Sequence, residues 1–385
     1  MDFAAACSEH PLATQATGEV LGELLEQLDG PPDLAVLFVT GPHRGVLEDI
    51  AATVRELLRP GCLVGATAVS VVAGRHELEE VPAISIWAGR TGPVTARHLD
   101  VVDTGDSHAL VGIEDDELAT AGTALLLADP GFPTDAVLGA LQDSHPDLVV
   151  AGGVASAGVG PGANFLVLDD RLHDRGAVVV LLGADLPVEV VVSQGCSPIG
   201  QPLTVTRAER NMLLELAGRP ALDRLQETLA ALDEGVRASA AQGLHLGRVV
   251  DEHELDFGMG DFLVRNVLGA DPSNGAVAVG DLVEVGSTVQ FQVRDAASAD
   301  LELRHLMDEH EGQSALVFTC NGRGMRLFGE PDHDASVVTE SLGTAAVAGM
   351  FCAGEVGPVG GRSFLHGFTA VTVIFRSPPS LRFPG

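Results

Sequence analysis

The segment at residues 347–366 combines a glycine-rich loop with three ionisable side chains. It contains five glycines and a proline, together with Glu355, Arg362 and His366. Glycines let backbone amides approach a ligand closely, because they have no Cβ atom. An arginine binds a carboxylate through two parallel hydrogen bonds, and a carboxylate binds an ammonium group. Glu355 and Arg362 therefore predict a site for a zwitterion. A structural salt bridge, or a carboxylate that caps loop amides, is the alternative interpretation.

A second loop of this kind follows the apolar run at residues 315–320. It reads Asn321-Gly-Arg-Gly324, and loops after strands are where α/β sheets bind ligands. A plain turn is the alternative here. For His366, a pH-sensitive contact competes with packing at the start of a strand. The expected ligand-binding residues are Glu355, Arg362, His366, Asn321, Arg323, Gly354 and Gly357.

Two cysteines give an alternative, enzymatic interpretation. Cys320 and Cys352 end two apolar runs of one unit, and they are candidates for close contact in space. A nucleophilic cysteine needs a nearby base, which His366 or His333 would supply. Buried, inert thiols are the competing interpretation. The chain has no Lys and no Tyr, which excludes a Schiff base and a phosphate loop of the Gly-Lys-Ser/Thr type. No catalytic residue is assigned.

The charge balance restricts the partners. The chain has 54 Asp and Glu against 22 Arg, a formal net charge of −32. This field repels nucleic acids and anionic membranes, so we expect neither as a partner. An acidic scaffold that binds another protein, or a homo-oligomer, stays open. The acids beside His253 and His333 do not converge on one ion, so we expect no metal, and we expect no cofactor.

The cysteine pattern and the N-terminus indicate a cytoplasmic protein. The five cysteines are far apart and never form a Cys-x-x-Cys pair, which is typical of reduced thiols. The first seven residues lack the positive and the long apolar regions of a secretory signal. No apolar stretch approaches the ~20 residues that cross a bilayer.

One order of elements occurs three times along the chain. It begins with a strand-like run at residues 33–39, continues with a helix at 46–58 and a strand at 62–67, and closes with a strand at 83–87. The same order returns over residues 123–168 and again over residues 315–375. Such recurrence predicts an internally repeated strand–helix–strand–strand unit.

Between the second and third copies the pattern changes. The β-branched runs at residues 176–182 and 188–192 predict a hairpin. Thr206-Arg-Ala-Glu209 has the form of a capping box for a helix that ends at Gly218. Several later runs alternate like antiparallel strands. The fold class is therefore α/β (α+β), with mixed β-sheets covered by helices in layered sandwich domains.

Three parts of the chain together resemble the FIST family, whose members carry paired FIST-N and FIST-C domains. These parts are residues 61–67 with 74–79, residues 195–206 with 211–222, and residues 318–323 with 347–366. The resemblance covers about Leu34 to Phe375. It implies an N-terminal segment at residues 1–30, a FIST-N domain at 31–218 and a FIST-C domain at 219–385, with the FIST-C motif beginning near residue 190.

The resemblance also implies a function. The family is viewed as a sensory, small-ligand-binding module in signal transduction, suggested to bind amino acids or similar metabolites. We therefore expect a stand-alone sensory protein that binds a small polar molecule, such as an amino acid, through its glycine-rich loops. Many relatives have Asn where this chain has Ala353, so the resemblance does not extend to a polar contact at that position.

Overall fold

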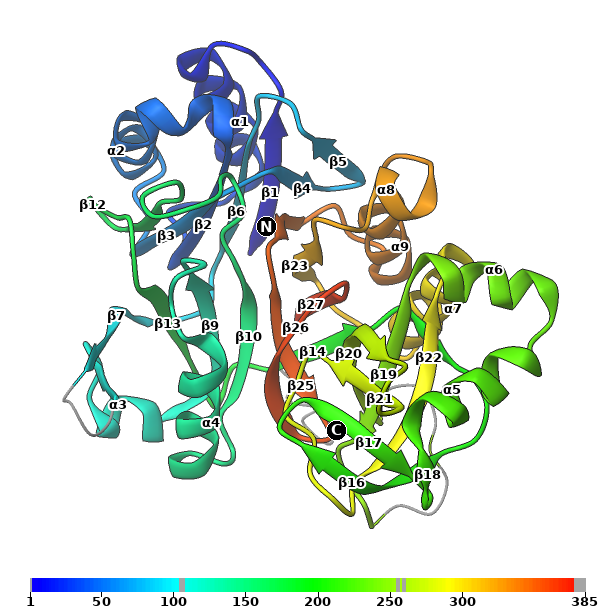
Figure 1. Ribbon diagram of the computed structural model, residues 1–385. Helices are drawn as coiled ribbons and strands as arrows, with labels where there is room; N and C mark the ends of the chain where they lie inside the picture. The colour runs from blue at the N-terminus through cyan, green and yellow to red at the C-terminus, as the bar shows by residue number, and fades with distance from the viewer. Residues whose placement is uncertain (1, 104–107, 254–256, 258–260, 377–385) are drawn as a thin grey trace, which may run out of the picture. The chain divides into compact units, whose positions relative to one another are not determined.

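The computed structural model describes residues 2–103, 108–253, 257 and 261–376 (Figure 1). The chain forms two compact units. The first consists of Met1–Val192 and Arg304–Gly385, and the second of Ser193–Leu303. Helices make up 26% of the structure and strands 42%, which confirms the expected mixed α+β class. Among the described residues, no helix combines the length and the apolar character that a bilayer crossing requires.

The first unit contains the three expected copies of one repeat (Figure 1). The first copy consists of β2 (Leu34–Thr40), η1 (Gly41–Val46), α2 (Leu47–Leu57), β3 (Cys62–Ala68), β4 (Ser70–Ala73), β5 (His76–Glu79) and β6 (Ile84–Gly89). The second consists of β9 (Ala121–Ala128), α4 (Thr134–Ser144), β10 (Val149–Val154), β11 (Leu166–Leu168), β12 (Arg171–His173) and β13 (Ala177–Gly183). The third consists of β23 (Ser314–Cys320), α8 (Met325–Phe328), α9 (His333–Leu342), β24 (Val347–Cys352), β25 (Glu355–Val359), β26 (Arg362–His366) and β27 (Ala370–Phe375).

The same strand pairings recur in every copy. The first strand lies parallel to the strand that follows the helix, in the pairs β2–β3, β9–β10 and β23–β24. On its other side, the first strand lies antiparallel to the last strand, in the pairs β2–β6, β9–β13 and β23–β27. Identical pairing in three separate stretches of the chain confirms the internal repetition.

The hairpin of each copy belongs to another copy's sheet. The hairpin β4–β5 of the first copy pairs with β24 of the third. The hairpin β11–β12 of the second copy pairs with β3 of the first, and the hairpin β25–β26 of the third pairs with β10 of the second. The three copies therefore exchange their hairpins in a closed cycle, and each sheet needs a second copy to be complete.

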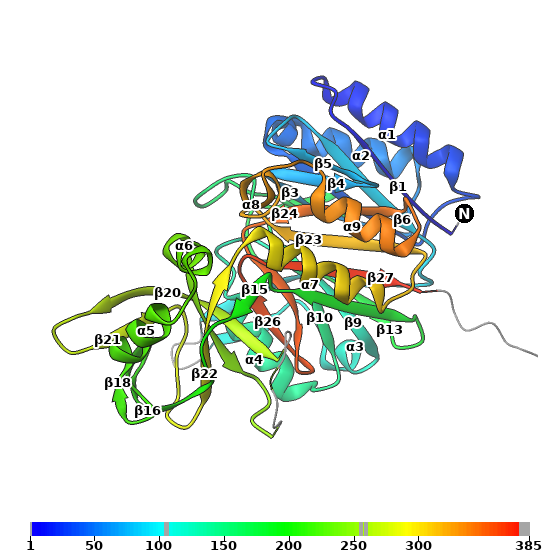
Figure 2. The same ribbon diagram turned by 90° about the vertical axis from the view of Figure 1, so that its right-hand side faces the viewer.

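The remaining elements of the first unit extend these sheets. Strand β1 (Phe3–Ser8) lies beside β6, β7 (Thr95–Asp103) and β8 (His108–Val111) extend the sheet beyond β13, and β14 (Val188–Ser193) lies beside β27. Helix α1 (Ala13–Gln27) packs on α2 over the outer face of the first sheet (Figure 2). The short helix α3 (Asp115–Ala119) precedes β9.

Both faces of these sheets are buried. Along β2, Val36 and Phe38 point into a core to which all three sheets contribute, and Phe38 meets Phe318 edge to face. The intervening Leu37 and Val39 pack against α1 and α2. This double burial explains why the strands of the repeat are continuous apolar runs in the sequence.

A glycine occupies the same place in the second strand of every copy. The register pairs are Leu37 with Gly65, Leu126 with Gly152, and Val317 with Gly349. A Cβ atom at any of these glycines would overlap the carbonyl oxygen of its partner on the first strand. The repeat therefore requires glycine at this position for a steric reason.

The second unit is built around a small barrel. Its strands are β15 (Cys196–Pro198), β16 (Leu203–Glu209), β17 (Met212–Leu216), β18 (Arg219–Pro220), β19 (Leu244–Val249), β20 (Phe262–Asp271), β21 (Ala276–Val279) and β22 (Thr288–Arg294). The order β22-β16-β17-β21-β20-β19 closes through the pairing of β19 with β22. Helices α5 (Ala221–Ala230) and α6 (Glu234–Gln242) belong to this unit, and α7 (Ala296–Asp308) crosses the division between the units.

Two local predictions between the copies are wrong. The runs at 176–182 and 188–192 do not form a hairpin, because β9 and β7 occupy both edges of β13 and β14 pairs in another sheet. The expected helix after Thr206 is the antiparallel pair β16–β17. There Val205 is buried in the barrel core, and the Thr206 hydroxyl accepts a hydrogen bond from the Gly218 amide.

We expect Gly349→Ala to lower the free energy of unfolding by about 1–3 kcal/mol or more, as overpacking does. The added methyl group would collide with the Val317 backbone in the centre of the sheet. Gly139→Ala in α4 is the control, because its Cβ meets nothing within 4 Å and alanine favours helix. Urea denaturation measures both variants. An equal stability of the two would contradict the steric role of Gly349.

Candidate functional site

The structure brings part of the predicted site together at the carboxyl ends of β23 and β24. Cys320 and Cys352 are register partners there, as the sequence suggested, and the Asn321 amide donates to the Cys352 carbonyl at 2.9 Å. Glu355 begins the next strand after Cys352, and its carboxyl group accepts a hydrogen bond from the Cys320 thiol. These residues form one buried polar cluster, with only Asn321 exposed.

Arg323 is a buried structural residue in this cluster. Its guanidinium donates two hydrogen bonds to Asp334, at 2.7 and 2.8 Å, and both side chains are completely buried. It also lies over the ring of Phe328 at 5.3 Å. Burial alone would raise the pKa of Asp334, but the ion pair with Arg323 and hydrogen bonds from His333 and Thr319 hold that pKa below its usual range. The ion pair with Asp334 therefore holds the Arg323 side chain against α9.

Glu355 is buried without any exposed surface. The amide and the hydroxyl of Thr369 donate to its Oε2 at 3.1 and 2.9 Å. Burial raises the pKa of Glu355 to about 8, although the hydrogen bonds from Thr369 and Cys320 oppose that shift. The carboxyl group is therefore mostly protonated at neutral pH, which makes it a hydrogen-bonding group of the core.

The β25–β26 hairpin does not bring Glu355 and Arg362 together. Glu355 pairs with His366 at one end of the hairpin, whereas Arg362 pairs with Val359 beside the turn and is exposed. Strand β25 runs between the two positions, so they cannot hold one small zwitterion between them. His366 is buried, and its Nε2 lies 2.9 Å from the Gly357 carbonyl oxygen.

The two glycines of the expected site have packing roles. A Cβ at Gly357 would lie 2.6 Å from the side chain of Val192, and one at Gly354 would lie 3.0 Å from Leu365. The thiol of Cys352 is fully buried, and burial, with the charges of Glu355 and Cys320, raises its pKa well above the ordinary value. A raised thiol pKa is the opposite of what a cysteine nucleophile needs.

The second copy contains an open cavity that the sequence did not reveal. It has a volume of about 680 Å³ and is lined by the loop after β9, by Gly160 and Pro161, by the segment Asp174–Gly176 and by Asp100 and Val101 of β7. The loop Asp129-Pro-Gly-Phe-Pro133 leaves the carboxyl end of β9, where α/β sheets bind ligands. The sequence analysis placed a copy of the repeat over residues 123–168, but the single acid in this loop carried no visible signal.

Asp129 is the buried acid of this cavity, with 8% of its surface exposed. One carboxyl oxygen accepts a hydrogen bond from the Gly131 amide at 2.8 Å. The other oxygen has no hydrogen-bond partner within the described part of the chain. Leaving a buried acceptor unsatisfied costs about 1–3 kcal/mol.

Arg175 supplies a positive charge to the same cavity. Its side chain is 79% exposed, and its Nε lies 3.6 Å from Asp100, too far for a direct hydrogen bond. Phe132 and Val101 contribute apolar surface to the lining. The cavity therefore combines a carboxylate, a guanidinium and an apolar wall, which together can hold a zwitterion with a short side chain.

Two known protein domains and several known proteins are similar to this chain. The family models described as FIST N domain and FIST C domain match residues 33–219 and 221–358. Uncharacterized protein Rv0628c of Mycobacterium tuberculosis is 43% identical, with 96% of this chain and 98% of the relative covered. Uncharacterized protein Mb0898c of Mycobacterium bovis is also 43% identical, with 95% and 96% covered.

The raised pKa of Glu355 predicts a pH-dependent stability. The unfolded chain ionises this group near pH 4.5 and the folded chain only near 8. Its contribution is therefore complete at low pH and is lost as pH rises through that interval. We expect the stability advantage of wild type over Glu355→Gln to shrink by up to about 1.4 kcal/mol per pH unit.

Urea denaturation between about pH 5 and 8 measures this difference. Glu48→Gln, at an exposed position of α2, is the control and should keep a constant difference from wild type. A constant difference for Glu355→Gln would mean that Glu355 is ionised in the folded protein across the whole interval.

Proposed function

Because this chain belongs to the FIST family, whose domains are generally sensory and ligand-binding, we propose that it senses an amino acid or a similar small zwitterion. The site is the cavity beside Asp129 and Arg175 in the second copy of the repeat. The observation that carries this proposal is the buried Asp129 carboxylate, which has one oxygen without a hydrogen-bond partner among the described residues.

An ammonium group is the donor that best suits Asp129. A charge-assisted hydrogen bond to a carboxylate is about twice as strong as a neutral one, and the Asp129 oxygen is shielded from water. Asp100 and Asp174 also line the cavity and reinforce the preference for a positive group. A neutral hydroxyl would satisfy the same oxygen, but without this electrostatic gain.

Arg175 is the proposed partner of the ligand's carboxylate. Its weak contact with Asp100, at 3.6 Å, leaves the guanidinium able to turn toward a ligand. The planar guanidinium matches a carboxylate through two parallel hydrogen bonds. Phe132 and Val101 would then contact the apolar part of the ligand. A cavity of about 680 Å³ lies within the usual size range of small-molecule sites.

We expect at least one amino acid to raise the melting temperature of the full chain in a screen of the common amino acids. Asp129→Asn keeps the shape and the bond from the Gly131 amide but removes the charge. It should weaken binding about 10-fold or more, because a charged hydrogen bond contributes about 1.5–3 kcal/mol. Arg175→Gln should weaken binding of the free amino acid but not of its methyl ester.

Arg171→Gln is the control, because Arg171 is exposed on the neighbouring strand β12 and lies outside the cavity lining. Calorimetric titration compares the three variants with wild type. Dicarboxylates and nucleotides serve as ligands of the wrong charge. The proposal fails if no amino acid binds, or if Asp129→Asn and Arg175→Gln bind as wild type does.

A further inference from the structure

The second copy of the repeat has a longer loop than the other two between its second strand and its hairpin. In the first copy a single residue, Val69, lies between β3 and β4, and in the third copy residues 353–354 lie between β24 and β25. In the second copy residues 155–165 lie between β10 and β11. Because the cavity beside Asp129 also belongs to the second copy, this longer loop is a candidate for contact with a ligand there.

Side chains hold the base of this loop. The Asn164 side chain accepts a hydrogen bond from the Gly158 amide at 3.1 Å and donates one to the Gly158 carbonyl at 2.9 Å. Arg44, in η1 of the first copy, donates to the Ala163 carbonyl. Both ends of the loop are therefore fixed, and a change of conformation between them would leave these hydrogen bonds intact.

The tip of the loop, residues 159–162, is exposed throughout, and the Val159 side chain is fully exposed. Gly160 and Gly162 have φ values of 98° and 69°, which favour glycine. A Cβ atom at either glycine would meet nothing within 4 Å apart from its neighbours in the chain. The tip is therefore loosely surrounded, and its glycines allow it to adopt another conformation.

The tip stands at the rim of the cavity beside Asp129. Gly160 and Pro161 belong to the lining of this cavity, and Val159 directly precedes them. The rest of the lining includes several apolar side chains, namely Val101, Pro130, Phe132 and Pro133. A single exposed valine is ordinary on a protein surface. Beside an apolar lining, however, a small displacement of the tip would remove its side chain from water, which is favourable.

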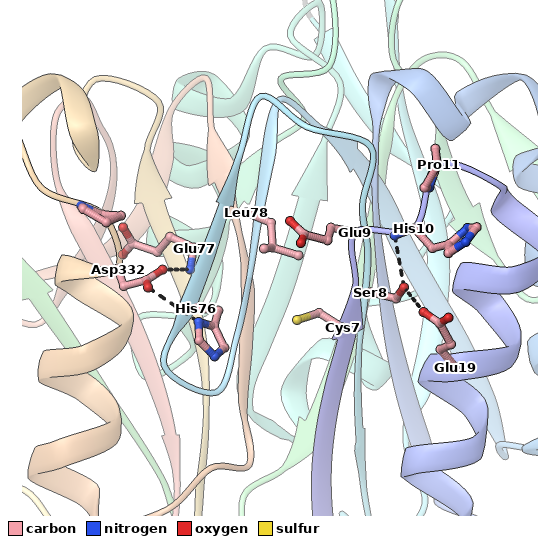
Figure 3. Close-up of a pocket in the computed structure, with 11 residues that line it drawn as sticks. Cys7, Ser8, Glu9, His10, Pro11, Glu19, His76, Glu77, Leu78 and Asp332 are labelled. Carbon is pink, nitrogen blue, oxygen red and sulfur yellow. Dashed lines mark hydrogen bonds and ion pairs between the residues drawn. The ribbon is translucent and has the colours of Figure 1, made fainter.

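The hollow at the end of β1 has a different lining (Figure 3). Most of its lining residues are ionisable. In Figure 3, Glu77 lies on the opposite side of β5 from Leu78, as successive residues of a strand do. The Ser8 hydroxyl donates to Glu19 at 2.5 Å, so these two polar groups bind each other. The lining that suits an apolar tip is therefore that of the cavity beside Asp129.

Building on the function proposed above, we propose that the tip closes over a bound amino acid with an aliphatic side chain. Val159 then contacts the side chain of the ligand from one side, and Phe132 and Val101 contact it from the other. Closing removes apolar surface of both the ligand and Val159 from water, so the side chain of the ligand contributes to affinity. A charged side chain of similar length would lose hydration against the same apolar surface.

Calorimetric titration of the full chain with leucine, alanine and glutamate tests this proposal. We expect leucine to bind at least about 10-fold more tightly than glutamate. Val159→Ser should weaken leucine binding about 10-fold, because it removes the apolar contact, and alanine binding by less than about 2-fold, because alanine has a single methyl group. Val236→Ser, at an exposed position of α6 in the second unit, is the matched control and should bind both ligands as wild type does.

Tryptophan fluorescence gives an independent measurement, because Trp87 is the single tryptophan of the chain and is completely buried. In the Val159→Trp variant, saturating leucine should move the emission to shorter wavelength as the new indole leaves water. Leu57→Trp, at an exposed position of α2, is the control and should keep its emission.

The outcomes separate the closing loop from the function on which it rests. The closing loop is overturned, with the proposed function intact, if leucine binds but Val159→Ser keeps full affinity or Val159→Trp keeps its emission. It is also overturned if alanine loses as much affinity as leucine, or if glutamate binds as tightly as leucine. Failure of every amino acid to bind overturns both the closing loop and the proposed function.

Discussion

In the first unit each copy of the repeat gives its hairpin to another copy, and the three sheets are joined in a cycle. Ser156 of the second copy forms hydrogen bonds with both other copies. Its hydroxyl donates to the Phe351 carbonyl of the third copy and accepts from the Val69 amide of the first at 3.0 Å. A copy without its neighbours would leave a strand edge unpaired. The unit is therefore expected to fold as a whole, not copy by copy.

The same architecture explains why the loops after the first strands differ in chemistry. In the third copy, Arg323 turns inward to Asp334, and the short helix α8 follows before α9 begins. In the second copy, the chain passes from β9 to α4 through Asp129–Pro133 with no helix between them. The third loop is filled by its own ion pair, whereas the second places Asp129 in the lining of a cavity. The repeated backbone therefore places a loop at the same position in each copy, but the side chains that fill this loop differ.

The sequence predicted the elements of the repeat well, because runs buried on both faces and the helices between them are local signals. It did not predict the exchange of hairpins, since pairing over long separations depends on which strand edge stays unoccupied. For that reason the runs that form β13 and β14 resemble a hairpin yet lie in different sheets. The charges of Glu355 and Arg362 were visible in the sequence, but the strand that separates them was not. Asp129 was visible too, but nothing local distinguished it from a turn-forming aspartate.

Net charge bears on which small molecules can reach the cavity beside Asp129. A protein with a net charge of −32 attracts cations and repels anions over the Debye length. A zwitterion carries no net charge, so it approaches the cavity beside Asp129 without this repulsion, and Arg175 then contributes locally to holding its carboxylate. A dianion would meet the full field before any contact with Arg175. The net charge therefore favours zwitterions over dianions at this cavity before shape is considered.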